Sequence, residues 1–166
     1  KPVRADLIGL RLPKERVTAR RNKNLNRLVI GGSLGATSLN QKIPEAIALM
    51  KQSDRPQIKH QCGKKHNESC KNNYEKRYVD AEVLPFIDNM RAAYEWADLV
   101  VCRSGALTIA ELSMVGIASI LIPYPYAADN HQFHNACFLK SKNAAQIIHE
   151  VDLDATSLAS LIMQYQ

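Results

Sequence analysis

The sequence predicts an α/β fold in which helices cover both faces of a six-stranded parallel sheet. Short apolar runs of strand length alternate with amphipathic stretches of helical length along nearly the whole chain. The 166 residues suffice for one compact domain with a buried core. Strands that alternate with helices form right-handed βαβ units, and such units place a parallel sheet between two helical layers.

The expected elements follow one another in strict alternation. The strands are expected at residues 27–32, 58–62, 81–86, 99–103, 119–124 and 145–149. The helices are expected at residues 37–51, 66–76, 89–97, 106–115, 130–140 and 154–164. Pro44 falls inside the first helix and has no amide hydrogen to donate. We therefore expect that helix to kink or to begin late, near Pro44.

The composition is that of an ordinary globular protein. Hydrophobic residues make up 46% and charged residues 23% of the chain. The longest apolar run, Ala118–Pro123, has the length of a strand and is too short to cross a bilayer. No CxxC pair or zinc-like spacing occurs, so reduced thiols are favoured over a disulfide framework. The four cysteines are Cys62, Cys70, Cys102 and Cys137.

Basic residues crowd the segment before the first expected strand, within a net charge of +6. This basic segment contains Arg11, Lys14, Arg16, Arg20, Arg21, Lys23 and Arg27. It is either a solvated basic loop or a surface attracted to an anionic membrane. Nucleic acid is disfavoured as a partner because the segment has no interleaved aromatics and no binding motif. We expect residues 1–26 to be linker and peripheral structure, and residues 27–166 to form the domain.

Two loops rich in small residues follow expected strands and lead into helices, at residues 31–35 and 103–108. In an open parallel sheet, ligands bind beyond the carboxyl ends of the strands. Small residues let the backbone approach a ligand, and free amides at a helix start attract phosphate. Each loop alone is also compatible with an ordinary tight turn. Together they fit a nucleoside diphosphate better than a single phosphate.

Several side chains near these loops suggest more specific contacts. Ser104 is a candidate N-cap of the helix at 106–115. Glu111 can accept hydrogen bonds from a ribose diol, although a solvent-facing helical glutamate is the alternative. Arg103 either adds positive charge for a phosphate or braces the loop. The polar side chains of residues 129–132 can hydrogen-bond the hydroxyls of a sugar.

The sequence assigns no catalytic residue and no metal site. It contains neither a nucleophile-elbow pattern nor a clear pair of glycosidase carboxylates. His131 and His134 have a helical spacing that can bind metal, but no third ligand accompanies them. We expect no metal and no cofactor.

Several motifs resemble those of the MurG family of glycosyltransferases in order and spacing. They are Gly-Gly-Ser-Leu-Gly-Ala at 31–36, Leu-Asn-Gln at 39–41, His-Gln-Cys-Gly-Lys at 60–64, Phe-Ile-Asp-Asn-Met at 86–90, the run 93–108 and Asp-Asn-His-Gln at 129–132. Pro2-Val3-Arg4 resembles the segment that joins the two domains of this family. The resemblance implies one Rossmann-like half of a two-domain, B-type, inverting glycosyltransferase.

The resemblance implies that the complete enzyme transfers N-acetylglucosamine from UDP-N-acetylglucosamine to the undecaprenyl-pyrophosphoryl-muramyl-pentapeptide lipid of peptidoglycan synthesis. The present residues would form the donor-binding domain. The expected base and the acceptor site would lie in an N-terminal domain, so this domain would bind UDP-N-acetylglucosamine or UDP without turnover. The enzyme would sit peripherally on the cytoplasmic side of the bacterial inner membrane.

The resemblance also implies roles for single residues. Arg4 and the backbone of Ile87 would contact the uracil, and Glu111 would bind the ribose hydroxyls. Gln132 would bind the sugar hydroxyls. The diphosphate would be held by Ser33, Ala106, Leu107 and Thr108, with support from Gly32, Arg103, Ser104 and Gly105.

Two alternatives keep the fold and change the function. One is a stand-alone nucleotide-sugar-binding subunit that pairs with a separate acceptor subunit. The other is a binding module without activity that uses its basic segment on membranes or acidic partners. The chain begins with Lys1 and has no signal-peptide pattern, so we expect this start not to be a natural N-terminus.

Overall fold

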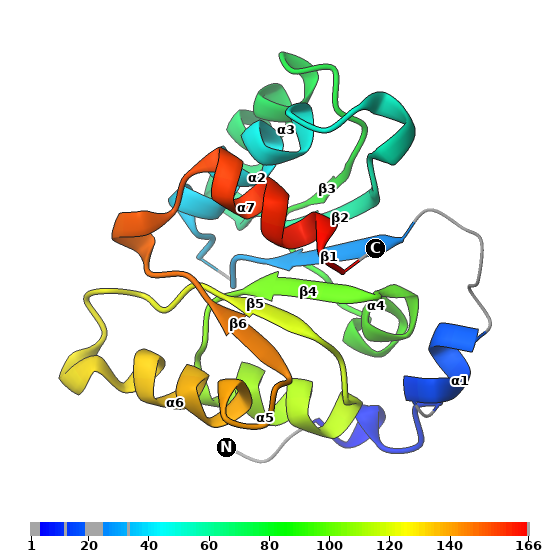
Figure 1. Ribbon diagram of the computed structural model, residues 1–166, viewed down its shortest axis with the longest axis vertical. Coiled ribbons are helices and arrows are strands. Elements are labelled where there is room, and N and C mark those ends of the chain that lie inside the picture. Colours follow the sequence, from blue (N-terminus) through cyan, green and yellow to red (C-terminus); the bar gives the residue numbers. More distant parts are fainter. Residues whose placement is uncertain (1–3, 12, 19–24, 33, 166) are drawn as a thin grey trace.

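A single sheet of six parallel strands forms the centre of the domain (Figure 1). The computed structural model describes residues 4–11, 13–18, 25–32 and 34–165. The strand order is β3-β2-β1-β4-β5-β6, which confirms the expected doubly wound parallel sheet. The strands are β1 (Asn26–Ile30), β2 (Gln57–Gln61), β3 (Glu82–Leu84), β4 (Leu99–Cys102), β5 (Ser119–Leu121) and β6 (Ala145–Ile147).

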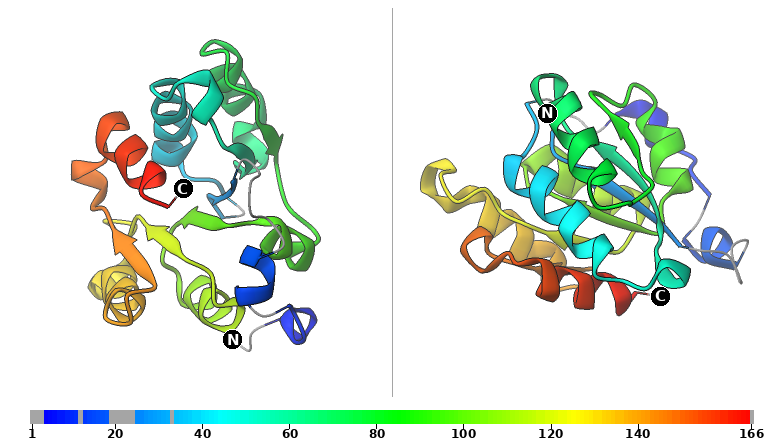
Figure 2. Two further views of the ribbon diagram at one scale, coloured as in Figure 1. Left: turned by 45° about the vertical axis from the view of Figure 1, so that its right-hand side comes forward. Right: turned by 90° about the horizontal axis from the view of Figure 1, so that it is seen from above.

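Helices cover both faces of the sheet, as Figures 1 and 2 show. One layer contains α2 (Thr37–Ala48), α3 (Asn67–Glu75) and α7 (Ala155–Met163). The opposite layer contains α4 (Met90–Trp96), α5 (Ala106–Val115) and α6 (His131–Lys140). The described residues also form short 3-10 helices along the chain: η1 (Ala5–Leu7), η2 (Gln52–Asp54), η3 (Lys64–His66), η4 (Ala128–Asn130) and η5 (Glu150–Asp152). No helix within the described ranges has the length and apolarity needed to cross a bilayer.

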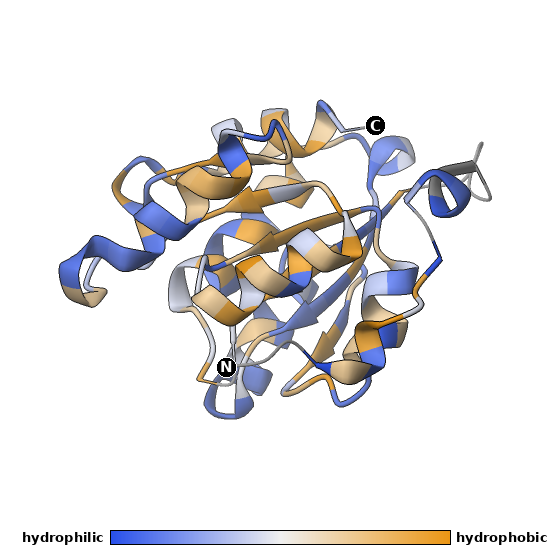
Figure 3. Ribbon diagram, turned by 90° about the horizontal axis from the view of Figure 1, so that it is seen from below, coloured by the Kyte–Doolittle hydropathy of each residue, from blue (hydrophilic) through white to orange (hydrophobic). Residues whose placement is uncertain are grey.

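Strand β4, in the middle of the sheet, is apolar on both faces because each face packs against a helical layer (hydropathy colours in Figure 3). All four residues of β4 are buried. Its side chains alternate: Leu99 and Val101 join the core under α2 and α7, whereas Val100 and Cys102 join the core beside α4 and α5. These two cores hold the sheet between the helical layers. Because β1 and β4 are parallel neighbours, the loops that follow them lie side by side at the carboxyl ends of the strands.

The segment before β1 is fastened to the α4–α5 side of the domain. Leu7 is buried in that core. Arg16, on α1 (Pro13–Thr18), is also buried and donates to the backbone carbonyls of Tyr94 and Val115. Arg91 of α4 donates to the carbonyls of Asp6, Ile8 and Gly9. The described part of the segment before β1 is therefore held against the domain by buried and hydrogen-bonded residues.

The expectation that α2 begins late at Pro44 is wrong. The helix begins at Thr37 and continues through Pro44, which is buried. A proline leaves the carbonyl four residues earlier without its helical donor, here the carbonyl of Asn40. Asn73 of α3 supplies the replacement, because its Nδ2 donates to the Asn40 carbonyl at 3.2 Å. A tertiary hydrogen bond thus compensates for the defect that the sequence indicated.

We predict that Asn73→Ala lowers the free energy of unfolding by about 1 kcal/mol, because the Asn40 carbonyl loses its donor. In a Pro44→Ala background the same substitution should cost less, since residue 44 then donates its own amide to that carbonyl. A double-mutant cycle by urea unfolding measures the difference. Asn72→Ala, at the exposed neighbouring position, is the control. Equal costs of Asn73→Ala in both backgrounds would contradict the assignment.

Candidate functional site

A cleft opens at the carboxyl ends of β1 and β4, the neighbouring strands at which the strand order reverses. The helix that follows β1 and the helix that follows β4 lie on opposite faces of the sheet (Figure 1). The two loops therefore diverge and leave a crevice, the usual place for a ligand in this fold. The cleft has a volume of about 640 Å³. Its lining includes Gly31, Gly32, Leu34, Gly35, Ala36, Thr37, Ser38, Arg103, Gly105, Thr108, Tyr124, Gln132 and Glu150.

The loop between β1 and α2 is held by close backbone contact with the loop after β2. Gly35 and Gly63 both have a positive φ, of 82° and 88°. A Cβ on Gly35 would lie 2.2 Å from the Cys62 carbonyl oxygen, and one on Gly63 would lie 2.5 Å from the Gly35 nitrogen. Only glycine fits both positions. Ser33, expected to hold the diphosphate, lies outside the described residues.

Helix α5 begins at the cleft with free backbone amides. Its first intrahelical donor is Ile109, which bonds to the Gly105 carbonyl at 3.0 Å. The amides of Ala106, Leu107 and Thr108 precede it and have no acceptor within the helix. Thr108 and Gly105 also line the cleft. Ala106, Leu107 and Thr108, three of the residues expected at the diphosphate, therefore lie at a helix N-terminus, which attracts anions.

The expectation that Ser104 caps α5 is wrong. The N-cap is Gly105, which makes no side-chain cap bond. Ser104 is fully buried, and its hydroxyl donates to the Gln132 carbonyl at 2.7 Å. Asn135 donates through Nδ2 to the Ser104 carbonyl at 3.1 Å. Ser104 therefore joins the loop after β4 to α6, because its hydroxyl donates there and accepts no hydrogen bond from an amide of α5.

Arg103 braces the floor of the cleft. Its Nη1 donates to the carbonyls of Ile122 and Pro123, and its Nη2 donates to Ser38 Oγ at 3.0 Å. It also forms an ion pair with Glu150, and its guanidinium lies 5.5 Å from the centre of the Tyr124 ring. Of the two roles considered for Arg103, these contacts favour the structural one.

Glu150 and Tyr124 are cleft residues that sequence reasoning missed. Glu150 follows the carboxyl end of β6, so the same rule that selected the other loops identifies it. Tyr124 sits in the proline-containing bend after β5, and its amide donates to Gln132 Oε1 at 3.0 Å. That bond orients Gln132 and leaves the amide nitrogen of its side chain to donate to a ligand. Gln132 also lines the cleft.

Glu111 and Arg4 form a separate group outside the cleft lining. Glu111 is 5% exposed, which excludes the alternative of a solvent-facing helical glutamate. Its Oε2 accepts a hydrogen bond from the Tyr94 hydroxyl at 2.9 Å, and its Oε1 lies 3.3 Å from Arg4 Nε. Glu111 lies one helical turn along α5 from Thr108, which lines the cleft.

The backbone amide of Ile87 is already engaged. It donates to Gln61 Oε1 at 2.9 Å, and the Ile87 side chain is buried. The Ile87 amide is therefore not free to donate to a ligand.

Burial governs the titration of the polar groups around this site. Burial, followed by the nearby Glu111 carboxylate, raises the pKa of Tyr94 well above its usual value, so its phenol remains a neutral donor. The same two causes raise the pKa of the Cys102 thiol to about 12. Burial lowers the pKa of His60 to about 3, and its ring bonds to the Tyr74 hydroxyl. All four cysteines are free thiols.

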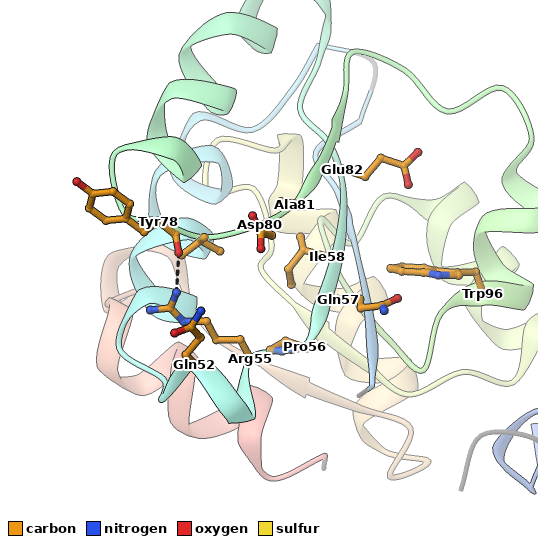
Figure 4. Close-up of a pocket in the computed structure, with 11 residues that line it drawn as sticks. Gln52, Arg55, Pro56, Gln57, Ile58, Tyr78, Asp80, Ala81, Glu82 and Trp96 are labelled. Carbon is orange, nitrogen blue, oxygen red and sulfur yellow. Dashed lines mark hydrogen bonds between the residues drawn. The ribbon is translucent and has the colours of Figure 1, made fainter. Parts of the chain in front are cut away.

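A second hollow, of about 680 Å³, lies at the amino ends of β2 and β3 (Figure 4). Its lining includes Arg55, Tyr78, Asp80, Glu82 and Trp96. Arg55 is engaged in structural bonds, since it donates to the backbone carbonyls of Tyr78, Met50 and Ala48. Without free backbone donors from a helix start, and with two carboxylates in the lining, this hollow is less suited to a diphosphate.

Residues 27–166 match the family model described as the glycosyltransferase family 28 C-terminal domain. The chain is 49% identical over 162 residues to the UDP-N-acetylglucosamine–N-acetylmuramyl-(pentapeptide) pyrophosphoryl-undecaprenol N-acetylglucosamine transferase of Paraburkholderia xenovorans. That match covers 95% of this chain and 43% of the relative. The transferase of the same name from Dechloromonas aromatica is 49% identical over 164 residues, which cover 99% of this chain and 46% of the relative.

A solved structure of MurG from Acinetobacter baumannii superimposes with a TM-score of 0.87 at 36% identity. The match covers 99% of this chain and 47% of that one. A glycosyltransferase of kitacinnamycin, at 20% identity and a TM-score of 0.63, shares the fold. The chain thus spans about half the length of the relatives it matches. Sequence, fold and domain match agree: this chain belongs to glycosyltransferase family 28, as a C-terminal domain of that family.

Proposed function

We propose that this chain is the donor-binding domain of an inverting N-acetylglucosaminyltransferase and binds UDP-N-acetylglucosamine in the cleft between β1 and β4. The observation that carries the proposal is the convergence of the glycine loop after β1 and the free amides of α5 on one crevice. The names of the relatives support the sugar and the nucleotide. The chain matches less than half of each relative, which favours a domain of a longer enzyme over a separate subunit.

The start of α5 would stabilise the departing UDP. In an inverting displacement, an acceptor hydroxyl attacks the anomeric carbon and the bond to the diphosphate breaks. Negative charge develops on the diphosphate oxygens as this happens. The amides of Ala106, Leu107 and Thr108 and the positive end of the helix dipole would offset that charge. Ser33 is proposed to add a hydroxyl from the opposite loop.

The sugar and the nucleoside would extend to either side of the diphosphate. Gln132 would donate to an N-acetylglucosamine hydroxyl through its free amide nitrogen, since its oxygen is held by Tyr124. Glu111 would accept from the ribose, and Arg4 with the Ile87 carbonyl would contact the uracil. Gly32, Ser104 and Gly105 shape the loops, and Arg103 holds the cleft together.

The acceptor would be bound by the part of the enzyme that these residues do not include. We propose that an N-terminal domain provides the catalytic base and the site for the undecaprenyl-pyrophosphoryl-muramyl-pentapeptide lipid. Closure of the two domains would position the acceptor hydroxyl over the anomeric carbon. The enzyme would act at the cytoplasmic face of the bacterial inner membrane. The basic residues before β1 are candidates for contact with anionic lipid, except Arg16, which is buried.

We predict that saturation-transfer NMR detects UDP-N-acetylglucosamine bound to this chain, and that UDP but not GDP displaces it. Glu111→Ala should weaken binding about tenfold, because the ribose loses an acceptor that carries charge. The exposed Glu75→Ala is the control for removal of a carboxylate elsewhere. If no uridine nucleotide binds a folded sample, or GDP competes as well as UDP, the proposal fails.

We predict that Arg103→Lys lowers the free energy of unfolding by about 1–3 kcal/mol. The single ammonium group of lysine cannot donate at once to all the acceptors that the planar guanidinium reaches. Urea unfolding measures the loss. Thr108→Val keeps the backbone amide but removes a hydroxyl from a residue that lines the cleft. It should show the opposite pattern, with nearly unchanged stability and weaker UDP binding, because the diphosphate loses a side-chain donor. A stable Arg103→Lys variant with strongly weakened UDP binding would instead assign Arg103 to the diphosphate.

A further inference from the structure

Three residues from three separate parts of the chain meet at the Glu111 carboxylate. Glu111 lies on α5, Tyr94 lies on α4 and Arg4 lies immediately before η1. The Tyr94 hydroxyl donates to Oε2 at 2.9 Å, and Arg4 Nε approaches Oε1 at 3.3 Å. The Glu111 side chain is only 6% exposed, so neighbouring residues surround the carboxylate almost completely.

The two oxygens of this carboxylate are held very differently. Oε2 accepts a hydrogen bond of ordinary length from the Tyr94 phenol, which is fully buried. Oε1 is buried and has no hydrogen bond among the described residues, although the Arg4 charge lies beside it. A buried acceptor without a donor is costly, and the cost disappears when a hydroxyl group reaches it. Oε1 is therefore the oxygen suited to accept from a ligand.

Tyr94 also limits how strongly Arg4 can bind Glu111. A guanidinium binds a carboxylate best through two parallel hydrogen bonds, one to each oxygen. Here one contact is present, from Nε to Oε1, because Oε2 is committed to Tyr94. The Arg4 side chain is 39% exposed, so water screens the remaining attraction. A ligand hydroxyl can compete with one screened contact far better than with a bidentate pair.

We propose that Tyr94 is a positioning residue that makes the nucleotide site selective for a ribose. It fixes Oε2 so that Oε1 stays oriented toward the ribose hydroxyls and the carboxylate cannot turn both oxygens to Arg4. This inference rests on the proposed binding of a uridine nucleotide. It assigns the hydroxyl of Tyr94, rather than its ring, to recognition, since a phenylalanine would fill the same space between α4 and α5.

The test is calorimetric titration of this chain with UDP and with 2′,3′-dideoxy-UDP, which lacks both ribose hydroxyls. The native chain should prefer UDP by about tenfold. Tyr94→Phe should reduce that preference to about threefold or less, while its affinity for the dideoxy analogue changes by less than about twofold. Tyr74→Phe is the matched control. It removes another buried phenol hydroxyl, bonded to His60, and should keep the native preference.

The possible outcomes separate this inference from the proposed function. A preference that is unchanged in Tyr94→Phe overturns it, and so does an equal loss of affinity for both nucleotides. If the native chain binds both nucleotides equally, the site binds UDP but the inference fails. If the native chain binds neither, the proposed function fails and the inference with it.

A second variant covers the case in which Tyr94→Phe does not fold. Glu111→Gln keeps an oxygen for Tyr94 and replaces the other oxygen with an amide donor. It should lose the ribose preference to the same extent, and a native preference in Glu111→Gln would also overturn the inference.

Discussion

The reversal of strand order between β1 and β4 is the constraint on which the rest of the site depends. These strands pair in parallel, yet the helices that follow them cover opposite faces of the sheet. The chain must therefore leave the two strand ends in opposite directions, and a cleft lies between the loops. The start of α5 and the glycines after β1 border this cleft because of the topology. The chemistry of the cleft thus follows from the winding of the sheet.

A frame of partly buried polar contacts surrounds the cleft. Ser104 and Asn135 join the loop after β4 to α6, and Arg103 ties that loop to the ends of β5 and β6. Gly35 and Gly63 lock the loop after β1 to the loop after β2. Each contact uses a polar group that burial would otherwise leave unsatisfied. The same groups therefore stabilise the domain and hold the amides of α5 in place before a ligand arrives, which lowers the cost of binding.

The order of elements was predictable because apolar runs and amphipathic stretches report strands and helices directly, and the strand ends then indicated the cleft. Tertiary partners were not predictable in the same way. Pro44 indicated a broken helix, because the sequence does not reveal that Asn73 supplies the missing donor. Ser104 has the residue type of an N-cap, but Gly105 occupies the N-cap position and the buried Ser104 hydroxyl donates to α6. The pairing of Tyr94 with Glu111 depends on how α4 and α5 pack, which one sequence does not specify.

The most direct test of the account is a titration of the isotopically labelled chain with UDP, followed by amide chemical shifts. The account predicts that the largest changes map to Ala106, Leu107 and Thr108 and to the glycine loop after β1, because their amides face the diphosphate. Small changes are expected around Tyr78 and Asp80 in the hollow at the amino ends of β2 and β3. Changes concentrated at that hollow, with the start of α5 unaffected, would contradict the claim that the crevice between β1 and β4 is the nucleotide site.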